Sequence, residues 1–351
     1  MVANKVLVMA AVPNGMPIPG QDLKIIKSEV DISKAPSGGL ILQNLYLSYD
    51  PYQRGKMRDP KIQSYTPGYQ INEPISNAAI SKVIKSSTPR FQEGDVVIGM
   101  GNFEEYSVIE KERAEKDQYE GGFSKLENPL GLDEKIFLGG LGMSGLTAYS
   151  SLYAIGQPKK GETIFISAAS GAVGQIVGQL AKREGLTVLG SVGSDEKLKF
   201  IIEELGFDSG FNYKKEKPGQ ALARLAPNGI DIYYDNVSGE QLDASLEAMK
   251  DFGRIIACGN VSQTSVKPED AYGLKNMRYT VSKRLRIRGF IVFDQDMGPV
   301  YKDEHQKNMQ KWIKDGEIKI KMSVTEGIDN AAEGLVGMLK GENFGKAILK
   351  V

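Results

Sequence analysis

Cysteine, histidine and tryptophan are almost missing from this sequence. Its 351 residues contain one of each, with the cysteine at Cys258 and the histidine at His305. One cysteine cannot form an intrachain disulfide. Zinc sites commonly take three or four protein ligands drawn from cysteine, histidine and carboxylate, so we predict no metal site. We expect Cys258 to be a buried small residue after an apolar run and His305, in the polar run KDEHQKN, to be solvated, and neither to do chemistry.

Net charge and long apolar runs are missing as well. The 44 basic and 44 acidic side chains cancel, which leaves no field to attract nucleic acid or an anionic membrane. No run approaches the roughly 20 apolar residues that span a bilayer. The apolar start of the chain alternates like a strand and stops at Pro13, unlike a signal-peptide core. We therefore expect a cytoplasmic protein with no nucleic-acid or membrane partner.

The chain is organised around residues 163–197, TIFISAASGAVGQIVGQLAKREGLTVLGSVGSDEK. The pattern predicts a strand, a tight turn, a helix and a second strand. Within it, the spacing Ala169-x-Gly171-x-x-Gly174 is a variant of the dinucleotide fingerprint. Gly171 would let the backbone approach a pyrophosphate, and Gly174 would let the helix pack on the strand. The glycines alone are equally consistent with a tight turn that binds nothing.

The end of the second strand distinguishes between the two nicotinamide cofactors. An NAD-binding unit normally carries Asp or Glu about 20 residues after the first glycine, to hold the ribose hydroxyls. Here residues 190–193 read Gly-Ser-Val-Gly, and the following loops offer Lys197 and Tyr213. A cation and a phenol donor suit a 2′-phosphate, so the sequence predicts NADPH rather than NADH as cofactor.

The rest of the chain predicts two domains. Residues 5–130 contain many short strands between turn residues, which is typical of a compact, mostly antiparallel β domain. From Thr163 onward six apolar strands alternate with helices, which predicts a doubly wound parallel sheet in an α/β fold. The rhythm breaks after about residue 310. We expect residues 1–135 and 312–351 to form a β-rich catalytic domain, and residues 136–311 the nucleotide-binding Rossmann domain.

Several motifs in order carry a resemblance to a known family. They are SYDPYQRGKM, AASGAVGQIVGQLAK, VGSDEK, FNYK, YYDNVSGE, FGRIIACGNVS, LRIRGFIV and MLKGENFGKAILKV. Together they resemble the zinc-free branch of the medium-chain dehydrogenase/reductase superfamily that comprises NADPH-dependent alkenal and enone double-bond reductases, among them prostaglandin reductase. The resemblance covers most of the chain. It implies a GroES-like first domain, NADPH as cofactor, a small-molecule activated alkene as substrate, and a homodimer.

The resemblance also implies roles for individual residues. Tyr279 would be the tyrosine near the reacting carbonyl. Apart from the resemblance, we expect the active site in the cleft between the two domains, where Tyr52 and Tyr69 could reach the substrate. Without the resemblance, the pattern favours packing of Tyr279 at a domain or subunit contact, and leaves Tyr52 and Tyr69 equally suited to packing within their own domain. The sequence departs from the family at Gln53 and in the run YGLKNMRYTVSKR, both near the expected substrate. The positions that would hold the cofactor are Ser170, Gly171, Ala172, Val173, Gly174, Lys197, Tyr213, Asn236, Cys258, Gly259, Asn260, Val261, Phe290, Ile291, Val292 and Asn343.

This inventory suits reduction of an alkene conjugated to a carbonyl. That reaction needs a hydride at the β-carbon, a donor to the enolate oxygen and a proton for the α-carbon. Hydroxyls from a tyrosine or from the cofactor ribose can serve as the donor. Oxidation of an alcohol without zinc would need a base such as histidine, which this chain lacks in a promising place. Two alternatives stay open, a quinone reductase of the same superfamily and a catalytically idle NADPH-binding protein.

Overall fold

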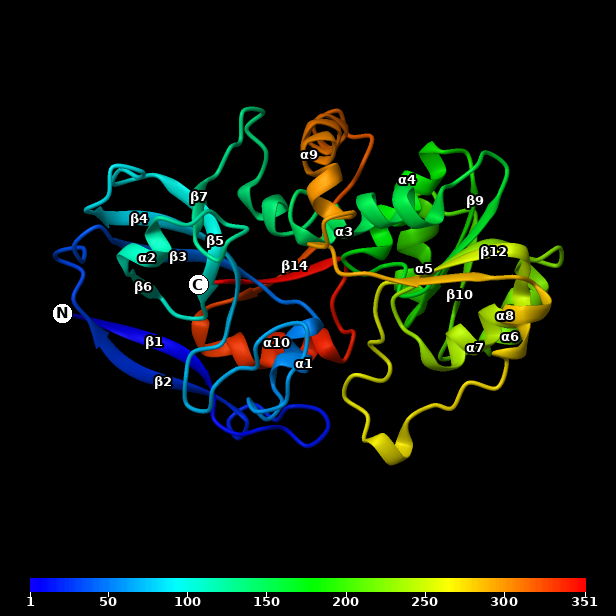
Figure 1. The fold of residues 1–351 in the computed structure, drawn as a ribbon, viewed down its shortest axis with the longest axis horizontal. Coiled ribbons are helices and arrows are strands. Elements are labelled where there is room, and N and C mark those ends of the chain that lie inside the picture. The colour runs from blue at the N-terminus through cyan, green and yellow to red at the C-terminus, as the bar shows by residue number, and fades with distance from the viewer. The chain divides into compact units, whose positions relative to one another are not determined.

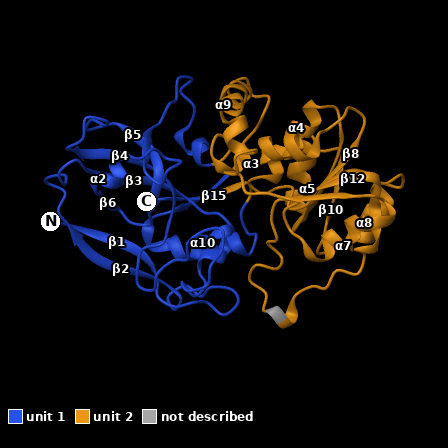
Figure 2. Ribbon diagram, viewed as in Figure 1, with its two compact units in different colours: residues 1–138, 322–343, 347–351 blue, residues 139–321, 344–346 orange. Residues whose placement is uncertain are grey.

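The computed structural model describes residues 1–267 and 269–351, which form two compact units (Figures 1 and 2). The first unit comprises residues 1–138, 322–343 and 347–351, and the second comprises residues 139–321 and 344–346. The first is built mainly on antiparallel strands and the second on a parallel sheet covered by helices, which confirms the predicted fold class. In the described chain, no helix is both long and apolar enough to cross a membrane.

The first unit contains two sheets. Strands β1 (Val2–Met9) and β2 (Leu23–Val30) pair antiparallel. The second sheet has, among the described residues, the order β14 (Met322–Glu326), β15 (Lys346–Lys350), β3 (Leu40–Ser48), β4 (Ser76–Ser86), β5 (Val96–Asn102) and β7 (Phe123–Lys125), with β6 (Tyr106–Ile109) pairing β3. The helices are α1 (Tyr52–Lys56), α2 (Lys111–Ala114) and α10 (Ala331–Leu339). Apolar side chains from β1, β3 and α10 share one core, so the C-terminal segment completes this unit.

The second unit is built on a six-stranded parallel sheet of described residues. Its order is β10 (Ser209–Asn212), β9 (Thr187–Val192), β8 (Thr163–Ile166), β11 (Ile230–Asp235), β12 (Met249–Ala257) and β13 (Arg286–Gly289). The helices are α3 (Met143–Ser151), α4 (Gly174–Arg183), α5 (Asp195–Lys199), α6 (Pro218–Leu225), α7 (Gly239–Ala248), α8 (Arg278–Ser282) and α9 (Gly298–Lys314). In chain order the strands read 3-2-1-4-5-6, which is the doubly wound arrangement that binds dinucleotides where the order reverses, next to the first strand.

The chain returns to the first unit later than we expected. Residues 312–321 belong to the second unit, because two buried glutamines of α4 hold their backbone. The Gln179 side chain donates to the Lys319 carbonyl at 2.9 Å and accepts from the Lys319 amide at 2.8 Å. The Gln175 side chain accepts from the amide of Lys321 at 2.9 Å. The two glutamine side chains thus satisfy backbone amides and carbonyls that a neighbouring strand would otherwise pair with. Such contacts leave no periodic pattern of apolar residues in the sequence.

His305 is fully buried, so the expectation of a solvated side chain was wrong. Its Nε2 lies 3.0 Å from the carbonyl oxygen of Gly140, and its ring packs against Tyr149 with centroids 5.7 Å apart. His305 and Met309 are one turn apart on α9 and both are fully buried, so they mark the inner face of this helix. Of the polar residues around His305 in the sequence, Lys302, Asp303 and Lys307 are exposed, whereas Gln306 donates to the Leu141 carbonyl at 2.8 Å. Burial lowers the pKa of His305 to about 4.

Candidate active site

Position 174, where α4 begins after β8, has room only for glycine. A Cβ atom on Gly174 would lie 2.4 Å from the carbonyl oxygen of Ala168 and 2.8 Å from the Cα atom of Ala169. Ala168 itself adopts a positive φ of 47°, and its carbonyl accepts a hydrogen bond from the amide of Gly171 at 2.9 Å. The N-terminus of α4 therefore packs directly on the end of β8. A strand end joined this closely to a helix N-terminus is the arrangement that binds a pyrophosphate in dinucleotide-binding folds.

Residues 344–346 return beside the turn between β8 and α4. The amide of Gly345 donates to the carbonyl of Ser170 at 2.8 Å, and Gly345 forms a parallel bridge with Gly171. Gly345 has a φ of 64°, and a Cβ atom there would lie 2.0 Å from the carbonyl oxygen of Lys321. Sequence reasoning missed Phe344 and Gly345, although the pair of glycines in GENFGK was a usable turn signal. Asn343, which was predicted to bind cofactor, immediately precedes them and belongs to the first unit.

Lys197 and Tyr213 lie at the carboxyl ends of β9 and β10. The Lys197 side chain is 7% exposed, and its ammonium lies 5.2 Å over the ring of Phe344. A Cβ atom on Gly193 would lie 3.0 Å from the Tyr213 hydroxyl, so the missing side chain at position 193 makes room for the phenol. Burial raises the pKa of Tyr213. This end of the sheet presents a cation and a phenol donor, as an adenosine 2′-phosphate requires.

The nearest carboxylate at this end has its own partners. Asp195 begins α5 and accepts a hydrogen bond from the Asn212 side chain at 2.9 Å. It also forms an ion pair with Lys215. These two contacts lower the pKa of Asp195. Because both carboxylate oxygens are engaged, Asp195 does not replace the ribose-binding acid that residues 190–193 lack.

The carboxyl ends of β8, β11 and β12 are tied together by hydrogen bonds. The amide of Asn236 donates to Ser167 Oγ at 2.9 Å, and its side-chain Nδ2 donates to the Ser167 carbonyl at 2.8 Å. The amides of Cys258 and Gly259 donate to the Asp235 carbonyl at 2.9 and 3.0 Å. Ser167 is fully buried, and it is a positioning residue that the sequence analysis missed. Only the tertiary structure brings it next to Asn236.

The structure thus gathers most predicted cofactor positions at one edge. Each of the six strands contributes there, because the carboxyl ends of parallel strands share one edge of the sheet. Val292 is buried, whereas Gly259, Asn260, Val261 and Ile291 are exposed. The positions of the second unit at this edge are Ser170, Gly171, Ala172, Val173, Gly174, Lys197, Tyr213, Asn236, Cys258, Gly259, Asn260, Val261, Phe290, Ile291 and Val292.

Tyr279 lies at the opposite edge of the same sheet. It belongs to α8, which precedes β13 (Figure 1). Its ring lies 4.7 Å from the cationic groups of both Arg278 and Lys283. Lys283 Nζ donates at 2.7 Å to the carbonyl of Met249, the first residue of β12. In a parallel sheet this contact places Tyr279 beside the amino ends of the strands. Within its own unit, Tyr279 therefore lies away from the carboxyl edge that carries the glycine turn, and its role near the reacting carbonyl stays a prediction.

Tyr52 and Tyr69 lie in and after α1, within the first unit. Tyr52 is half-buried and donates to the Asn77 side-chain oxygen at 2.7 Å. Tyr69 is 5% exposed, donates to the Ser76 carbonyl at 2.6 Å and belongs to the core of this unit. Gln53, where the sequence departs from the family, donates to the Tyr69 hydroxyl at 3.3 Å. The Tyr69 hydroxyl is therefore committed to its own unit, and what it can offer a ligand is the face of its ring.

Cys258 and His305 are unsuited to nucleophilic or basic chemistry. Cys258 is partly exposed as a residue, which differs from the expected full burial, but burial of its thiol raises the pKa to about 12. His305 is held neutral by burial, as described above. No cluster of three or more histidine, cysteine or carboxylate side chains suited to a metal ion occurs in the described residues.

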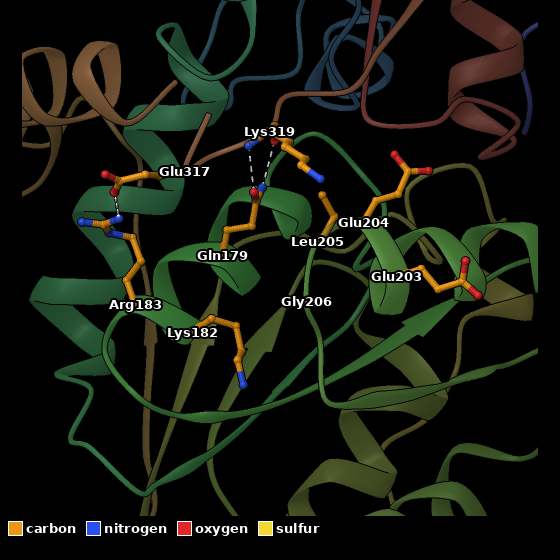
Figure 3. A pocket seen from close by; sticks show the side chains of 9 residues that line it. All are labelled: Gln179, Lys182, Arg183, Glu203, Glu204, Leu205, Gly206, Glu317 and Lys319. Atoms are coloured by element: carbon orange, nitrogen blue, oxygen red, sulfur yellow. Dashed lines mark hydrogen bonds and ion pairs between the residues drawn. The ribbon is translucent and has the colours of Figure 1, made fainter. Parts of the chain in front are cut away.

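A surface hollow lies at the other end of α4 (Figure 3). It has a volume of about 380 Å³ and is lined by charged and polar side chains, including Lys182, Arg183 and Glu203. Arg183 is paired with Glu317 across it. The hollow is formed from the second half of α4, whereas the glycine turn lies at the start of this helix. Its mixed charges and paired ions indicate a solvated surface rather than part of the candidate site.

Comparison with known proteins agrees with this geometry. Residues 5–116 match the family model described as the N-terminal domain of oxidoreductase, and residues 172–307 match that of zinc-binding dehydrogenase. The chain is 52% identical to NADP-dependent oxidoreductase RED1 of Cochliobolus heterostrophus over 100% of this chain and 98% of that protein. It is 40% identical to a 2-alkenal reductase (NADP(+)-dependent) of Nicotiana tabacum, again over 100% and 98% of the two chains.

Solved structures agree as well. The crystal structure of CurA in complex with NADPH from Vibrio vulnificus has a TM-score of 0.88 and 32% identity, covering 99% of each chain. Both family models, the full-length relatives and this shared architecture lead to the same assignment. The chain belongs to the medium-chain dehydrogenase/reductase superfamily, in its branch of NADP-dependent oxidoreductases.

Proposed function

We propose that this protein uses NADPH to reduce the carbon–carbon double bond of α,β-unsaturated ketones and aldehydes. The observation that carries the proposal is the turn at Gly174, where a Cβ atom would collide with the backbone of Ala168 and Ala169, so that the N-terminus of α4 packs directly on the end of β8 as it does in dinucleotide-binding folds. Similarity to a 2-alkenal reductase over the whole chain supports the substrate class. Bound NADPH supplies a hydride, here for the β-carbon of the alkene.

The residues of the second unit have distinct tasks in this proposal. The backbone amides of residues 171–174 bind the pyrophosphate, and Lys197 with Tyr213 binds the 2′-phosphate. Asn236, locked by Ser167, and the loop 258–261 border the nicotinamide half of the cofactor. Asn343 lies next in the chain to Phe344, which contacts Lys197, and we assign it to the same site.

A homodimer would give Tyr279 a route to the site. β13 pairs with β12 along one side, and its four residues are all exposed. Val281 is 81% exposed, Phe252 63% and Ile287 40%, so apolar side chains surround this edge. Antiparallel pairing of β13 with β13 of a second copy would cover them. It would also bring the amino end of one β13, which follows the helix that contains Tyr279, beside the carboxyl end of the other.

In this arrangement Tyr279 of one subunit donates to the enolate oxygen of substrate bound by the other. A phenol is a suitable donor, and the hydroxyl of the cofactor ribose is a second one. We also assign Tyr52 and the ring of Tyr69 to substrate binding. The carbonyl oxygen thus meets hydroxyl donors, which suits stabilisation of an enolate.

A substrate panel tests the proposed reaction. Purified protein is mixed with NADPH and separate enals, enones and quinones, and oxidation of the cofactor is followed by absorbance. We expect the highest kcat/KM with an enal or enone, and a product saturated at the double bond with its carbonyl intact. Preference for quinones would favour the quinone reductase alternative. Tight NADPH binding without turnover of any alkene would instead indicate an idle binding protein.

Two variants test the dimer and Tyr279 together. Tyr279→Phe should lower kcat on the best enone roughly tenfold to a hundredfold, with little change in the Kd for NADPH. Ile287→Lys should give a monomer by sedimentation and a similar loss of kcat, because charge on an edge strand opposes pairing. Val300→Lys, at a residue 64% exposed on α9, is the matched control and should stay dimeric. A monomeric Ile287→Lys enzyme with full kcat would refute the contribution across subunits.

A further inference from the structure

Three cations lie within five residues at α1 and just after it, and two of them have their donors engaged. The Arg54 guanidinium donates to the Gly15 carbonyl, at 3.0 Å from Nε. The Arg58 guanidinium donates to the carbonyls of Ile62 and Gly55, both at 2.8 Å. Neutral carbonyls satisfy these donors without cancelling the charge. The segment therefore has a positive local potential.

Lys56, between these arginines, has no such partner. It is 9% exposed, and its ammonium lies 4.2 Å from the ring centroid of Tyr69 and 5.9 Å from that of Tyr52. Among the described residues, no carboxylate or carbonyl within hydrogen-bond or ion-pair distance engages it. The ammonium still reaches solvent. In the described chain, the side-chain polar atoms that have neither solvent access nor a hydrogen-bond partner are Thr280 Oγ1 and Gln310 Oε1, and the Lys56 ammonium is not among them.

An ammonium in this position is unusual in energetic terms. Lysine is rarely buried without an acidic partner, because removing its charge from water is unfavourable. The two aromatic faces recover part of that free energy. Burial and the nearby charge of Arg58 lower the pKa of Lys56 to about 8. The group is therefore a cation at neutral pH with unused hydrogen-bond donors.

The surrounding groups favour an external anion as the missing partner. The hydroxyls of Tyr52 and Tyr69 donate away from the ammonium, to Asn77 and Ser76. The Asp50 carboxylate, which acts electrostatically on both tyrosines, accepts from Asn77 Nδ2 at 2.9 Å. Tyr65, which also acts on Tyr52, is 62% exposed and has its pKa raised by burial, so it stays neutral. Among the described groups here, the ammonium of Lys56 is thus the cation whose hydrogen-bond donors are not engaged.

We propose that Lys56 binds a carboxylate carried by the substrate, so that the enzyme prefers acidic enones over their neutral counterparts. The ammonium donates to the carboxylate, and the two aromatic rings hold it in place and border the apolar part of the substrate. This inference rests on the proposed enone reductase activity and on the assignment of Tyr52 and Tyr69 to the substrate. It names a specificity-determining residue, and Lys56 takes no part in hydride or proton transfer.

The titration of Lys56 gives the preference a pH dependence with a definite sign. The ammonium form is present below a pKa of about 8 and is lost as the pH rises through it. Binding of a carboxylate therefore weakens at alkaline pH, while binding of a neutral enone does not change for this reason. An arginine at position 56 stays charged throughout and should abolish the difference.

A matched pair of substrates tests the proposal. The probes are 4-oxo-2-pentenoate and its methyl ester, which share one carbon skeleton. Because the ester also withdraws electrons from the alkene more strongly than the carboxylate does, the acid-to-ester ratio is compared between proteins and pH values rather than used as an absolute preference. For the wild-type enzyme, the ratio of kcat/KM for the acid over the ester should fall between pH 6.5 and 9.5. Lys56→Met should lower this ratio tenfold or more at the lower pH, and Lys56→Arg should keep it at both pH values. Lys61→Met, at an exposed lysine nearby, is the control and should match the wild type.

A binding measurement separates this inference from the reductase proposal. Calorimetry with 4-oxopentanoate, the saturated acid, in the presence of NADP⁺ should show binding to the wild type and at least tenfold weaker binding to Lys56→Met. Failure of the wild type to reduce either enone, with this binding difference intact, would overturn the reductase activity alone. An unchanged acid-to-ester ratio in Lys56→Met, or equal binding of the acid by both proteins, would overturn the role of Lys56.

Discussion

Replacing Gly174 by alanine should damage the cofactor site through one added methyl group. The new Cβ would lie 2.4 Å from the Ala168 carbonyl oxygen, whereas ordinary contact begins at 3.4 Å, so the turn or the helix must move by about 3.4 − 2.4 = 1.0 Å. The atoms that the new Cβ would meet belong to the backbone of Ala168 and Ala169, and backbone atoms cannot move aside by a change of rotamer as a side chain can. The displacement therefore has to be taken up by the turn or by the N-terminus of α4, which we propose bind the pyrophosphate together.

The magnitude follows from two effects of that displacement. Overpacking of this kind destabilises by about 1–3 kcal/mol, which corresponds to a fall in Tm of roughly 2–12 °C for a unit of this size. A shift of about 1 Å also stretches backbone hydrogen bonds to phosphate beyond their useful range. Loss of one such bond to a charged group raises the Kd for NADPH about tenfold or more.

The assay is thermal unfolding of each variant with and without NADPH, together with direct titration of NADPH by fluorescence. Gly219→Ala is the matched control, because Gly219 also lies in the first turn of a helix, α6, and nothing lies within 4 Å of its added Cβ. That control should be neutral or more stable by up to about 1 kcal/mol. Wild-type Tm and NADPH affinity in Gly174→Ala would refute the argument from close packing.

Three further predictions address the cofactor, pH and metal. Lys197→Ala should weaken NADPH about tenfold or more and NADH far less, and equal use of both cofactors by the wild type would contradict the assignment of a 2′-phosphate site. Burial lowers the pKa of His305 from 6.5 to about 4, so between these two pH values the unfolded chain holds a proton that the folded chain does not. The free energy of unfolding, measured with urea, should therefore fall by ~3 kcal/mol as the pH drops from 6.5 to about 4, and His305→Gln should show a flatter pH profile. Chelators should leave activity unchanged, and elemental analysis should find no stoichiometric zinc. One zinc per chain that tracks activity would contradict the prediction that this sequence has too few cysteine and histidine ligands for a zinc site.

The six strands of the second unit and the turn after β8 could be predicted because their signals are local. Each strand is a short apolar run between turn residues, and Gly171 and Gly174 follow the first of them at the spacing a helix N-terminus requires. Lys197 and Tyr213 follow the next two strands, so the rule that parallel strands share a carboxyl edge was enough to place them together. A residue that follows a strand of a parallel sheet lies at the carboxyl edge of that sheet, so its place in the sequence is enough to locate it.

Long-range packing decided the rest, and no local pattern encodes it. His305 stands among polar residues in the chain but faces Gly140 and Tyr149 in the fold. Tyr279 precedes a strand of the expected sheet, yet it lies at the amino edge because α8 packs on the end of α7. Lys56 reads as one more surface cation until its burial between two rings is seen. The sequence by itself determined the elements, their order and the cofactor class, because periodicity and turn chemistry act over a few residues. Only the tertiary structure decided which side chains lose water and which charges lack a partner, because those depend on atoms distant in the chain.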